Sequence, residues 1–319
     1  MSSPNDIHCL DAIDLQGQPL HLAIGMFDGF HRGHQSIIQA AVDGARARGG
    51  VPGVLTFWPH PSRLLCPQAP VLMIMPPEQK AALLYRAGVE LVIQETFDPN
   101  FAAINAHAFP LFLNEALPSL SDIYVGANFR FGQGRLGHIT LLKSRAALQG
   151  IRVSGIRPMR SQGKIISSTI VRQALKAADM ERVAALLGRP YSCTGAISPG
   201  RRMGQRLGFP TFNLAWAPEL QPPYGVYAVR ASFGEEGHAL PGVANYGLRP
   251  TFDPDNREPV LEVHCLVDPD EAHASHLGES LSVDWLHYFR EEHSFASHEA
   301  LRAQIALDKQ AAMQFFALA

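Results

Sequence analysis

The sequence predicts an α/β domain with a parallel sheet covered on both faces, followed by a small all-β domain and a C-terminal helix. Apolar, strand-like runs alternate with helical segments through the first half, and short strand-like runs separated by turn residues fill the second half. The chain has 319 residues, enough for about two domains of roughly 150 residues each. Apolar residues make up 46% and charged residues 18% of the chain. This composition supplies enough apolar side chains for hydrophobic cores and excludes a disordered protein.

The first half is predicted to contain four strands that alternate with helices. The strands cover residues 21–27, 51–57, 90–95 and 122–125, and the helices cover residues 35–48, 77–87, 105–115 and 139–149. Gly49-Gly50, Gly88 and Gly150 mark the ends of three of these helices. Residues 59–77 are rich in proline and form a long excursion after the second strand, which is either a functional flap or a surface loop.

The second half changes character after a helical segment at residues 168–187. Gly188-Arg189-Pro190 breaks the chain there, so we predict one domain at residues 1–187 and a second at 188–319. Strand-like runs follow at residues 191–197, 224–232, 240–246 and 260–267, with predicted hairpin loops at 234–237 and 253–256. This pattern is typical of a small β-barrel or sandwich, and a final helix at about 297–316 is expected to pack across it.

Charge and cysteine content limit the partners and the compartment. There are 27 Lys+Arg and 29 Asp+Glu, a net charge of −2, so the chain lacks the overall basic charge of a nucleic-acid-binding protein. The four cysteines lie far apart in sequence, which is typical of a reducing compartment. No signal peptide and no apolar run of membrane-spanning length is visible. We therefore expect a cytoplasmic monomer or weak homo-oligomer without nucleic-acid or membrane partners.

The strongest chemical signal is the segment GMFDGFHRGH at residues 25–34, where the first strand gives way to the first helix. Asp28-Gly29 makes the turn, and His31 and His34 share one face at the start of the helix. Helix N-termini favour phosphate, and two imidazoles add donors aimed at the same place. The pattern suits nucleotidyl transfer, in which charge builds on an α-phosphate and no protein nucleophile is needed. A His/His zinc pair or two surface histidines are the alternatives, and no third zinc ligand stands at a suitable spacing.

Three further segments can contribute to the same site. Residues 166–172, ISSTIVR, open a helix whose hydroxyls and arginine can hold phosphates, or simply cap the helix. Residues 124–132, YVGANFRFG, follow a strand end, where Asn128 can hydrogen-bond a ligand and Phe129 or Phe131 can stack on one; core aromatics are equally compatible. His60, within FWPHP at residues 57–61, either faces the site or shapes the loop.

The second half carries a glycine-rich segment and a strand with two polar residues. Gly200, Gly204 and Gly208 can close a loop over phosphates, while Thr211 and Asn213 offer oxygen ligands to Mg²⁺; ordinary turns are the alternative. In the strand LEVH at residues 261–264, alternation places Glu262 and His264 on one face. A carboxylate inside an apolar barrel mouth can act as general base on a primary hydroxyl, whereas a solvent-facing strand edge gives it no role.

Over nearly its whole length the chain resembles the bacterial bifunctional riboflavin kinases/FMN adenylyltransferases, also called FAD synthetases. The family patterns GxFDGxHxGHQ, FxPHP, VGxxFxFG and SSTxxR match residues 25–35, 57–61, 125–132 and 167–172. The resemblance implies a nucleotidyltransferase domain with a Rossmann-like sheet, in which His31 and His34 stabilise the pentacoordinate α-phosphate during FAD formation. It also implies that substrate or nucleotide is bound by Gly25, Phe27, Asp28, His60, Asn128, Phe129, Ser167, Ser168, Thr169 and Arg172.

The second half resembles the riboflavin kinase module. Its GxxLGxPTAN, GVANxGxRPT and LEVH elements match residues 204–213, 242–251 and 261–264. By this resemblance Glu262 is the base that takes the proton from the ribityl 5′-hydroxyl, and Thr211 and Asn213 hold Mg²⁺ and ATP phosphates. Gly204, Gly208 and Pro210 are implied to complete the nucleotide site, and Asn245 and Arg249 to shape the loop around the ligands. ATP is the implied co-substrate, riboflavin and FMN are the substrates, and FMN and FAD are the products.

Three positions depart from the family patterns. Met26 replaces a common Asn, and His276 stands where Tyr commonly precedes Gly278. Phe212 replaces the alanine of PTAN, and an inward-pointing ring there would crowd the ATP site. His273 and His276 are interpreted as part of a solvated acidic loop rather than as metal ligands.

Other functions fit parts of the sequence. Phe212 leaves open an adenylyltransferase with a flavin-binding barrel that lacks kinase activity, and a flavin sensor or storage protein would keep the pockets without the chemistry. An adenylyltransferase or cytidylyltransferase acting on another substrate explains only the first half.

Overall fold

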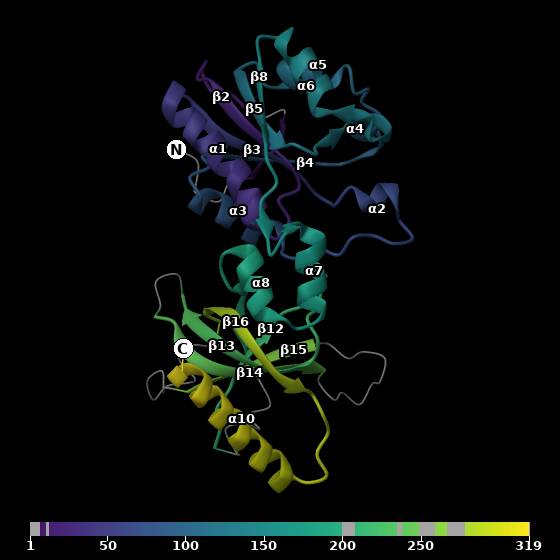
Figure 1. The fold of residues 1–319 in the computed structure, drawn as a ribbon. Helices are drawn as coiled ribbons and strands as arrows, with labels where there is room; N and C mark the ends of the chain where they lie inside the picture. Colours follow the sequence, from purple (N-terminus) through teal and green to yellow (C-terminus); the bar gives the residue numbers. More distant parts are fainter. Residues whose placement is uncertain are drawn as a thin grey trace. The chain divides into compact units, whose positions relative to one another are not determined.

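The structure is a computed structural model that describes residues 7–10, 13–199, 208–234, 238–248, 259–266 and 278–318. The chain divides into two compact units, Met1–Ser168 and Thr169–Ala319 (Figure 1). Within the described residues, no helix is both long and apolar enough to span a bilayer.

The first unit is built on a six-stranded parallel sheet in the order β1-β4-β3-β2-β5-β8. The strands are β1 (Ile7–His8), β2 (Leu20–Ile24), β3 (Val51–Phe57), β4 (Leu91–Glu95), β5 (Leu120–Gly126) and β8 (Arg152–Ile156). All residues of β2 and β3 are buried, which explains their nearly continuous apolar sequences. The chain proceeds from β2 through β3 to β4 on one side, and β5 and β8 lie on the other. Ligands of such sheets bind at this reversal, beyond the carboxyl ends of the strands.

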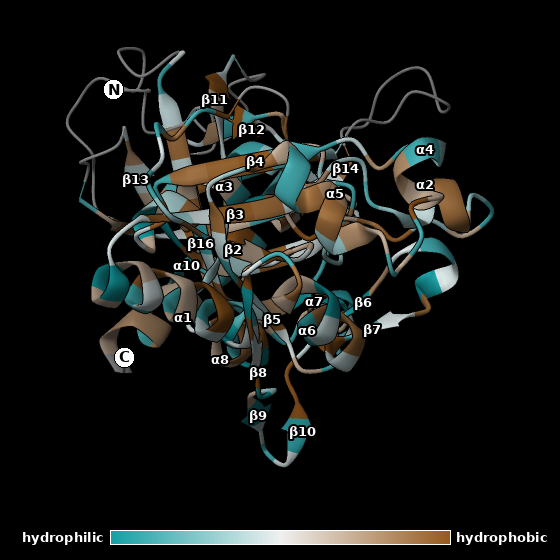
Figure 2. Ribbon diagram, turned by 90° about the horizontal axis from the view of Figure 1, so that it is seen from above, coloured by the Kyte–Doolittle hydropathy of each residue, from teal (hydrophilic) through white to brown (hydrophobic). Residues whose placement is uncertain are grey.

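Helices cover both faces of this sheet, as the sequence predicts. One face carries α1 (Arg32–Arg48) and α3 (Pro77–Arg86), and the other carries α5 (Phe109–Ala116) and α6 (Ile139–Ala147), with shorter helices α2 (Ser62–Leu65) and α4 (Pro99–Ala102). Side chains alternate between the two cores: Leu22 packs in the core containing α5 and α6, and Ala23 in the core containing α1 and α3. The hydropathy colouring in Figure 2 shows the apolar strands between the helices.

The second unit is a closed barrel of six antiparallel strands in the order β11-β12-β15-β14-β13-β16. The strands are β11 (Tyr191–Ser198), β12 (Phe212–Ala215), β13 (Gly225–Phe233), β14 (Leu240–Leu248), β15 (Pro259–Cys265) and β16 (Ser280–Glu291). Helices α7 (Ser168–Lys176) and α8 (Met180–Leu187) precede the barrel, and α10 (His298–Leu318) packs against β13 and β14. The structure therefore decides between barrel and sandwich in favour of the barrel.

Aromatic side chains fill the barrel interior. Trp285, Tyr227 and Tyr246 are fully buried, with ring centroids 4.6 Å apart for Tyr227 and Trp285 and 5.7 Å apart for Tyr246 and Trp285. Because the interior is packed with rings, a ligand of this unit has to bind on the outer face of the barrel wall or at its rim.

Several predicted boundaries were wrong. The first strand ends at Ile24, and residues 25–31 form the turn that leads into α1. The single helix predicted at 168–187 is two helices, because Ala178 adopts a left-handed φ of 54° and the Asp179 carboxylate caps α8 by accepting from Arg182 N–H (3.1 Å). The predicted loop at 253–256 lies outside the described residues.

Short elements and three longer strands were missed. The short ones are β1, α2, α4 and the hairpins β6 (Arg130–Phe131)–β7 (Gly137–His138) and β9 (Arg160–Ser161)–β10 (Lys164–Ile165), with a 3₁₀ turn at Gln133–Arg135. The longer strands are β8, an exposed edge strand with little apolar signal, β12, which pairs with β11 and β15, and β16, which pairs with both β11 and β13 to close the barrel.

A buried polar network ties α1 to the amino ends of the strands. Asp122 accepts two hydrogen bonds from Arg152 (2.9 and 2.7 Å) and one from Arg48 (2.9 Å). The Tyr124 hydroxyl accepts from Arg48 (2.5 Å) and lies 3.1 Å from His21 Nδ1. Burial raises the pKa of Asp122, but the hydrogen bonds from Arg152 and Ser121 outweigh it and hold the pKa below its usual value. Burial lowers the pKa of His21 and keeps its ring neutral near pH 7.

Gly44 in the middle of α1 is explained by this network. A Cβ there would lie 1.8 Å from the Tyr124 hydroxyl oxygen, so the helix can approach the sheet only with glycine at this position. Helix propensity alone predicts that Gly44→Ala stabilises the chain by about 1 kcal/mol. We expect the opposite, a loss of about 2 kcal/mol through overpacking, measured by urea unfolding.

The matched control for this test is Gln39→Ala on the exposed side of the same helix, which should change the free energy of unfolding by less than about 0.5 kcal/mol. Equal or greater stability of Gly44→Ala would show that the Tyr124 hydroxyl does not restrict this position.

Candidate functional sites

The turn between β2 and α1 has an unusual backbone. Phe27 and Phe30 have φ values of 51° and 42°, and Gly29 between them has a φ of 79°. Left-handed conformations cost a non-glycine residue about 1 kcal/mol or more, so surrounding contacts have to hold this turn. Here the buried carboxylate of Asp28 accepts from Ile74 N–H (3.0 and 3.2 Å), and Gln35 donates to the Phe30 carbonyl (2.9 Å).

The two histidines of the motif lie together at the N-terminus of α1. His31 caps the helix, its Nδ1 accepting from the backbone N–H of His34 (3.2 Å), and the two rings stack with centroids 3.6 Å apart. Since Nδ1 is an acceptor, a neutral His31 ring carries its proton on Nε2, where it can be donated to a ligand. The Phe27 ring packs edge-on against the His34 ring, with their centroids 5.3 Å apart.

A cavity of about 290 Å³ opens beside these rings, at the carboxyl ends of β2 and β5 where the strand order reverses. It therefore lies where parallel sheets place their ligands. Its lining brings together eight of the residues predicted from the sequence: Gly25, Phe27, His31, His34, Asn128, Phe129, Ser167 and Ser168. Arg157 also lines this cavity and was missed, because it lies between the motifs.

Three other predicted residues do not line this cavity. Asp28 lines none of the described cavities; its carboxylate holds Ile74, and its carbonyl accepts from the Ser168 hydroxyl (2.9 Å), joining the two motifs of the site. Thr169 and Arg172 belong to the second compact unit, so their part in this site stays a prediction.

A second cavity, of about 650 Å³, shares Gly25, His34, Asn128 and Phe129 with the first. His60 lines it, as predicted, and its Nδ1 accepts from Ser62 N–H (3.1 Å). Phe131, which the sequence offered as a stacking partner, also lines it, together with four rings that were not predicted as ligand contacts: Phe57, Phe97, Phe101 and Phe109. Rings converging from separate segments of the chain form an apolar site suited to a flat aromatic group.

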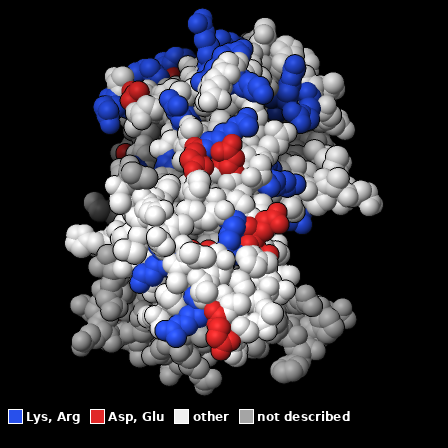
Figure 3. All heavy atoms as spheres, turned by 60° about the horizontal axis from the view of Figure 1, so that its bottom comes forward, with Lys and Arg blue, Asp and Glu red and all other residues white. Residues whose placement is uncertain are grey.

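Positive charge collects around both cavities. Between Asp122 and Asp179 the sequence has ten Lys or Arg residues and no Asp or Glu, although the whole chain has a net charge of −2. Arg157 lines the smaller cavity, and Arg130 and Arg135 line the larger one. Figure 3 shows Lys and Arg side chains gathered on one part of the surface with few acidic side chains among them. Such a region attracts anionic ligands.

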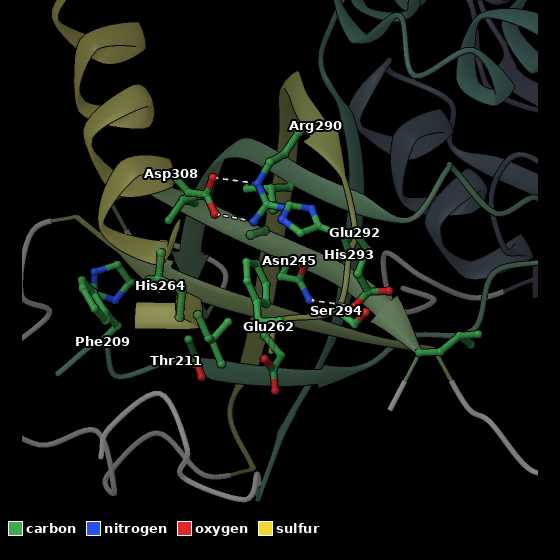
Figure 4. A pocket seen from close by; sticks show the side chains of 17 residues that line it. Phe209, Thr211, Asn245, Glu262, His264, Arg290, Glu292, His293, Ser294 and Asp308 are labelled. Atoms are coloured by element: carbon green, nitrogen blue, oxygen red, sulfur yellow. Dashed lines mark hydrogen bonds and ion pairs between the residues drawn. The ribbon is translucent and has the colours of Figure 1, made fainter. Parts of the chain in front are cut away.

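The second unit has its own cavity, of about 590 Å³, between the barrel wall and α10 (Figure 4). Thr211, Asn245, Glu262 and His264 line it from the barrel side. Arg290 of β16 and Asp308 of α10 form a two-bonded ion pair (2.9 and 2.6 Å) that ties the helix to the barrel.

Strand register fixes the positions of the catalytic candidates. Glu262 of β15 pairs directly with Asn213 of β12 and with Asn245 of β14, so these three side chains form a row on one face. Its neighbours Leu261 and Val263 are fully buried on the opposite, interior face. Glu262 thus lies on the outer face of the barrel wall, which corrects the expectation of a carboxylate inside the barrel mouth.

His264 positions the segment that carries Thr211. Its Nδ1 donates to the Pro210 carbonyl (2.8 Å), which fixes the backbone directly before Thr211. Gly208 has a left-handed φ of 87°, which explains the glycine, but it does not line the described cavity, nor do Pro210 and Asn213. Gly204, Arg249 and His276 lie outside the described residues.

Phe212 points away from the cavity. It is 2% exposed and meets Phe233 edge-on with centroids 4.9 Å apart, on the face opposite to Asn213 and Glu262. The ring therefore leaves the cavity beside Thr211 open.

Comparison with known proteins assigns a family to each part of the chain. A family model described as FAD synthetase matches residues 15–170, and one described as riboflavin kinase matches residues 187–316. The compact units divide at Ser168, so the predicted boundary at 187/188 stays a prediction.

Curated relatives match almost the whole chain. The bifunctional riboflavin kinase/FMN adenylyltransferase of Escherichia coli K12 is 35% identical over 298 residues, covering 93% of both chains. The protein of the same name from Bacillus subtilis is 32% identical, covering 92% of both chains. A crystal structure described as a macrolide-efflux protein from Streptococcus pneumoniae has a TM-score of 0.83 at 27% identity, covering 96% of this chain and 97% of its own. This likeness supports the fold of both units; the efflux named in that description is not carried over.

Proposed function

The chain belongs to the family of bifunctional riboflavin kinases/FMN adenylyltransferases and makes FMN from riboflavin and then FAD from FMN; we propose which of its residues carry each step. The observation that supports the division most strongly is that each unit has its own cavity lined by the motifs of one activity.

In the second unit, Glu262 is the general base of the kinase. Its carboxylate lines the cavity between the barrel and α10, where a primary hydroxyl can approach it from the open side. Glu262 takes the proton of the ribityl 5′-hydroxyl as that oxygen attacks the γ-phosphorus of ATP; the bond to the β-phosphate oxygen breaks, and ADP leaves.

Mg²⁺ is proposed as the metal of the kinase. Thr211 and Asn213, which stand beside Glu262 at the start of β12, offer hydroxyl and amide oxygens, and oxygen ligands are the type that Mg²⁺ accepts. Thr211 and Asn213 would hold the ion together with ATP phosphates. When bound, the ion neutralises charge on the transferring phosphate. Mg²⁺ prefers six oxygen ligands, so substrate phosphates would complete the coordination.

In the first unit, His31 and His34 stabilise the transition state of adenylyl transfer. A phosphate oxygen of FMN attacks the α-phosphorus of ATP, the bond to the β-phosphate oxygen breaks, and pyrophosphate leaves. His31, His34 and the positive end of α1 line the cavity in which charge develops on the α-phosphate oxygens. Ser167, Ser168 and Arg157 line the same cavity and add donors for the phosphates.

The flavin of FMN is proposed to occupy the larger, aromatic cavity. That cavity shares Gly25, His34, Asn128 and Phe129 with the smaller one, so a flavin among its rings can extend its phosphate toward the histidines. Arg130 and Arg135 add positive charge along the way.

The buried position of Phe212 removes the crowding that favoured a barrel without kinase activity. We also propose that the enzyme works in the cytoplasm, where ATP is available and exposed thiols such as Cys9 and Cys66 stay reduced. A monomer or weak homo-oligomer without nucleic-acid or membrane partners remains the expectation.

His31→Ala and His34→Ala should each lower FAD formation from FMN by roughly a hundredfold, because one preorganised donor stabilises such a transition state by about 3 kcal/mol. Chromatography of flavins after incubation with FMN, ATP and Mg²⁺ measures this loss. FMN formation from riboflavin by the same variants is the internal control. A parallel loss of both activities with the fold intact would contradict the assignment.

Glu262→Gln keeps the size of the side chain and removes its basicity. Riboflavin phosphorylation should fall by about a thousandfold, while FAD formation from supplied FMN should continue at the wild-type rate. Kinase turnover unchanged by this substitution would rule out Glu262 as the base.

Phe212→Ala restores the alanine that is common in this motif. The variant tests whether the ring contributes to core packing alone or also to catalysis. The cavity left in the core should cost about 3 kcal/mol of stability, whereas kcat for riboflavin at 20 °C should stay within twofold of wild type. A large change in the KM for ATP would show instead that the ring borders the nucleotide.

A further inference from the structure

Lys80 is a buried lysine that no step above uses. It lies on α3, is 1% exposed, and reaches beneath the turn between β2 and α1. Its ammonium donates to the hydroxyl of Thr56 on β3 (2.8 Å) and to the carbonyl of Met26 (3.3 Å). Lysine is almost never so completely buried in a folded protein unless its charge is compensated.

Burying the charged side chain of Lys80 costs free energy. Burial lowers its pKa to about 8, and the carboxylate of Asp28, the ionised group whose field acts on it, opposes that decrease. An apolar side chain would avoid this cost, so stability does not explain why a charge is placed here.

The contacts of Lys80 lead directly to the reacting residues. The Met26 carbonyl accepts from Lys80 and also from the Thr56 hydroxyl (3.1 Å). The next residue is Phe27, whose left-handed backbone begins the strained turn and whose ring contacts His34. Lys80 lines neither cavity of this unit, so its effect on a ligand has to pass through the turn.

We propose that the buried ammonium of Lys80 is a positioning residue for adenylyl transfer, holding the Met26 carbonyl so that the strained turn presents His31 and His34 to the α-phosphate. Asp28, within the left-handed segment, ties the same turn to the backbone N–H of Ile74. Two buried, oppositely charged side chains therefore hold the turn, Lys80 directly before its left-handed segment and Asp28 within that segment. The inference rests on the proposed role of the histidines in FAD formation.

The test uses Lys80→Met, which keeps the length of the side chain and removes its charge and donors, in the full chain. FAD formation from FMN should fall about 10- to 100-fold, because small misplacements of reacting groups have effects of this size. The loss should appear in kcat, with the KM values for FMN and ATP within about threefold of wild type, since Lys80 touches neither substrate. FMN formation from riboflavin should be unchanged.

A pH profile separates positioning from general packing. Wild-type adenylyl transfer should decline as the pH rises past about 8, where the ammonium loses its proton. The Lys80→Met variant should lack that alkaline decline while keeping its lower kcat. Glu78→Met, on the exposed side of the same helix, is the matched control and should retain the wild-type rate and profile.

Thr56→Val provides a second variant in case Lys80→Met does not fold, because it removes the shared hydroxyl and leaves the lysine in place. It should lower kcat for FAD formation by a smaller factor of about 5 to 10. Wild-type FAD formation by a folded Lys80→Met or Thr56→Val variant would overturn the inference. If His31→Ala retains full FAD formation, the proposed function of the site fails first; if only Lys80→Met does, the positioning role fails alone.

Discussion

The left-handed turn between β2 and α1 is the constraint on which the first site depends. Phe27 and Phe30 adopt left-handed backbone conformations, which glycine adopts freely but which cost any other residue free energy. In return, the chain leaves a buried strand and enters a helix within a few residues, so both histidines lie at the helix N-terminus and at the strand reversal of the sheet. The conformation persists because buried side chains hold it: Asp28, Lys80 and Gln35 each bond to the turn or to its neighbours.

The two units solve the same chemical problem with different scaffolds. Both must bind ATP and transfer part of it to a flavin, but a parallel sheet offers helix N-termini at its edge and a barrel does not. The cavity of the first unit is accordingly lined by the N-terminus of α1, by His31 and His34 and by Arg157. The barrel instead presents a row of side chains across three strands, Asn213, Glu262 and Asn245, on the outer face of its wall. That wall forms a cavity only because α10 covers it, and the Arg290–Asp308 ion pair fastens the helix there.

Much of this organisation could be predicted from local sequence patterns. Apolar runs bounded by glycine placed β3 correctly to the residue, and the HxxH motif predicted the shared face on which His31 and His34 stack. The missed features depend on contacts distant in sequence. The alternation of Leu281, Val283 and Trp285 marks β16, yet its role in closing the barrel depends on pairing with β11 and β13. Glu262 was assigned to the correct strand face, but which face is the interior depends on the packing of the aromatic core.

Lys80 and Gly44 show why such residues escape a reading of the sequence. Each lies in an ordinary helical segment, where lysine predicts solvent exposure and glycine predicts only a weaker helix. Lys80 is buried because its helix packs over the strand that carries Thr56, and Gly44 is required because Tyr124 projects its hydroxyl at the helix backbone. In both cases the partner lies more than twenty residues away and gives no periodic signal. The motifs therefore identify residues that line the cavities, whereas the residues that hold those motifs in place are found only once the packing of the helices on the sheet is known.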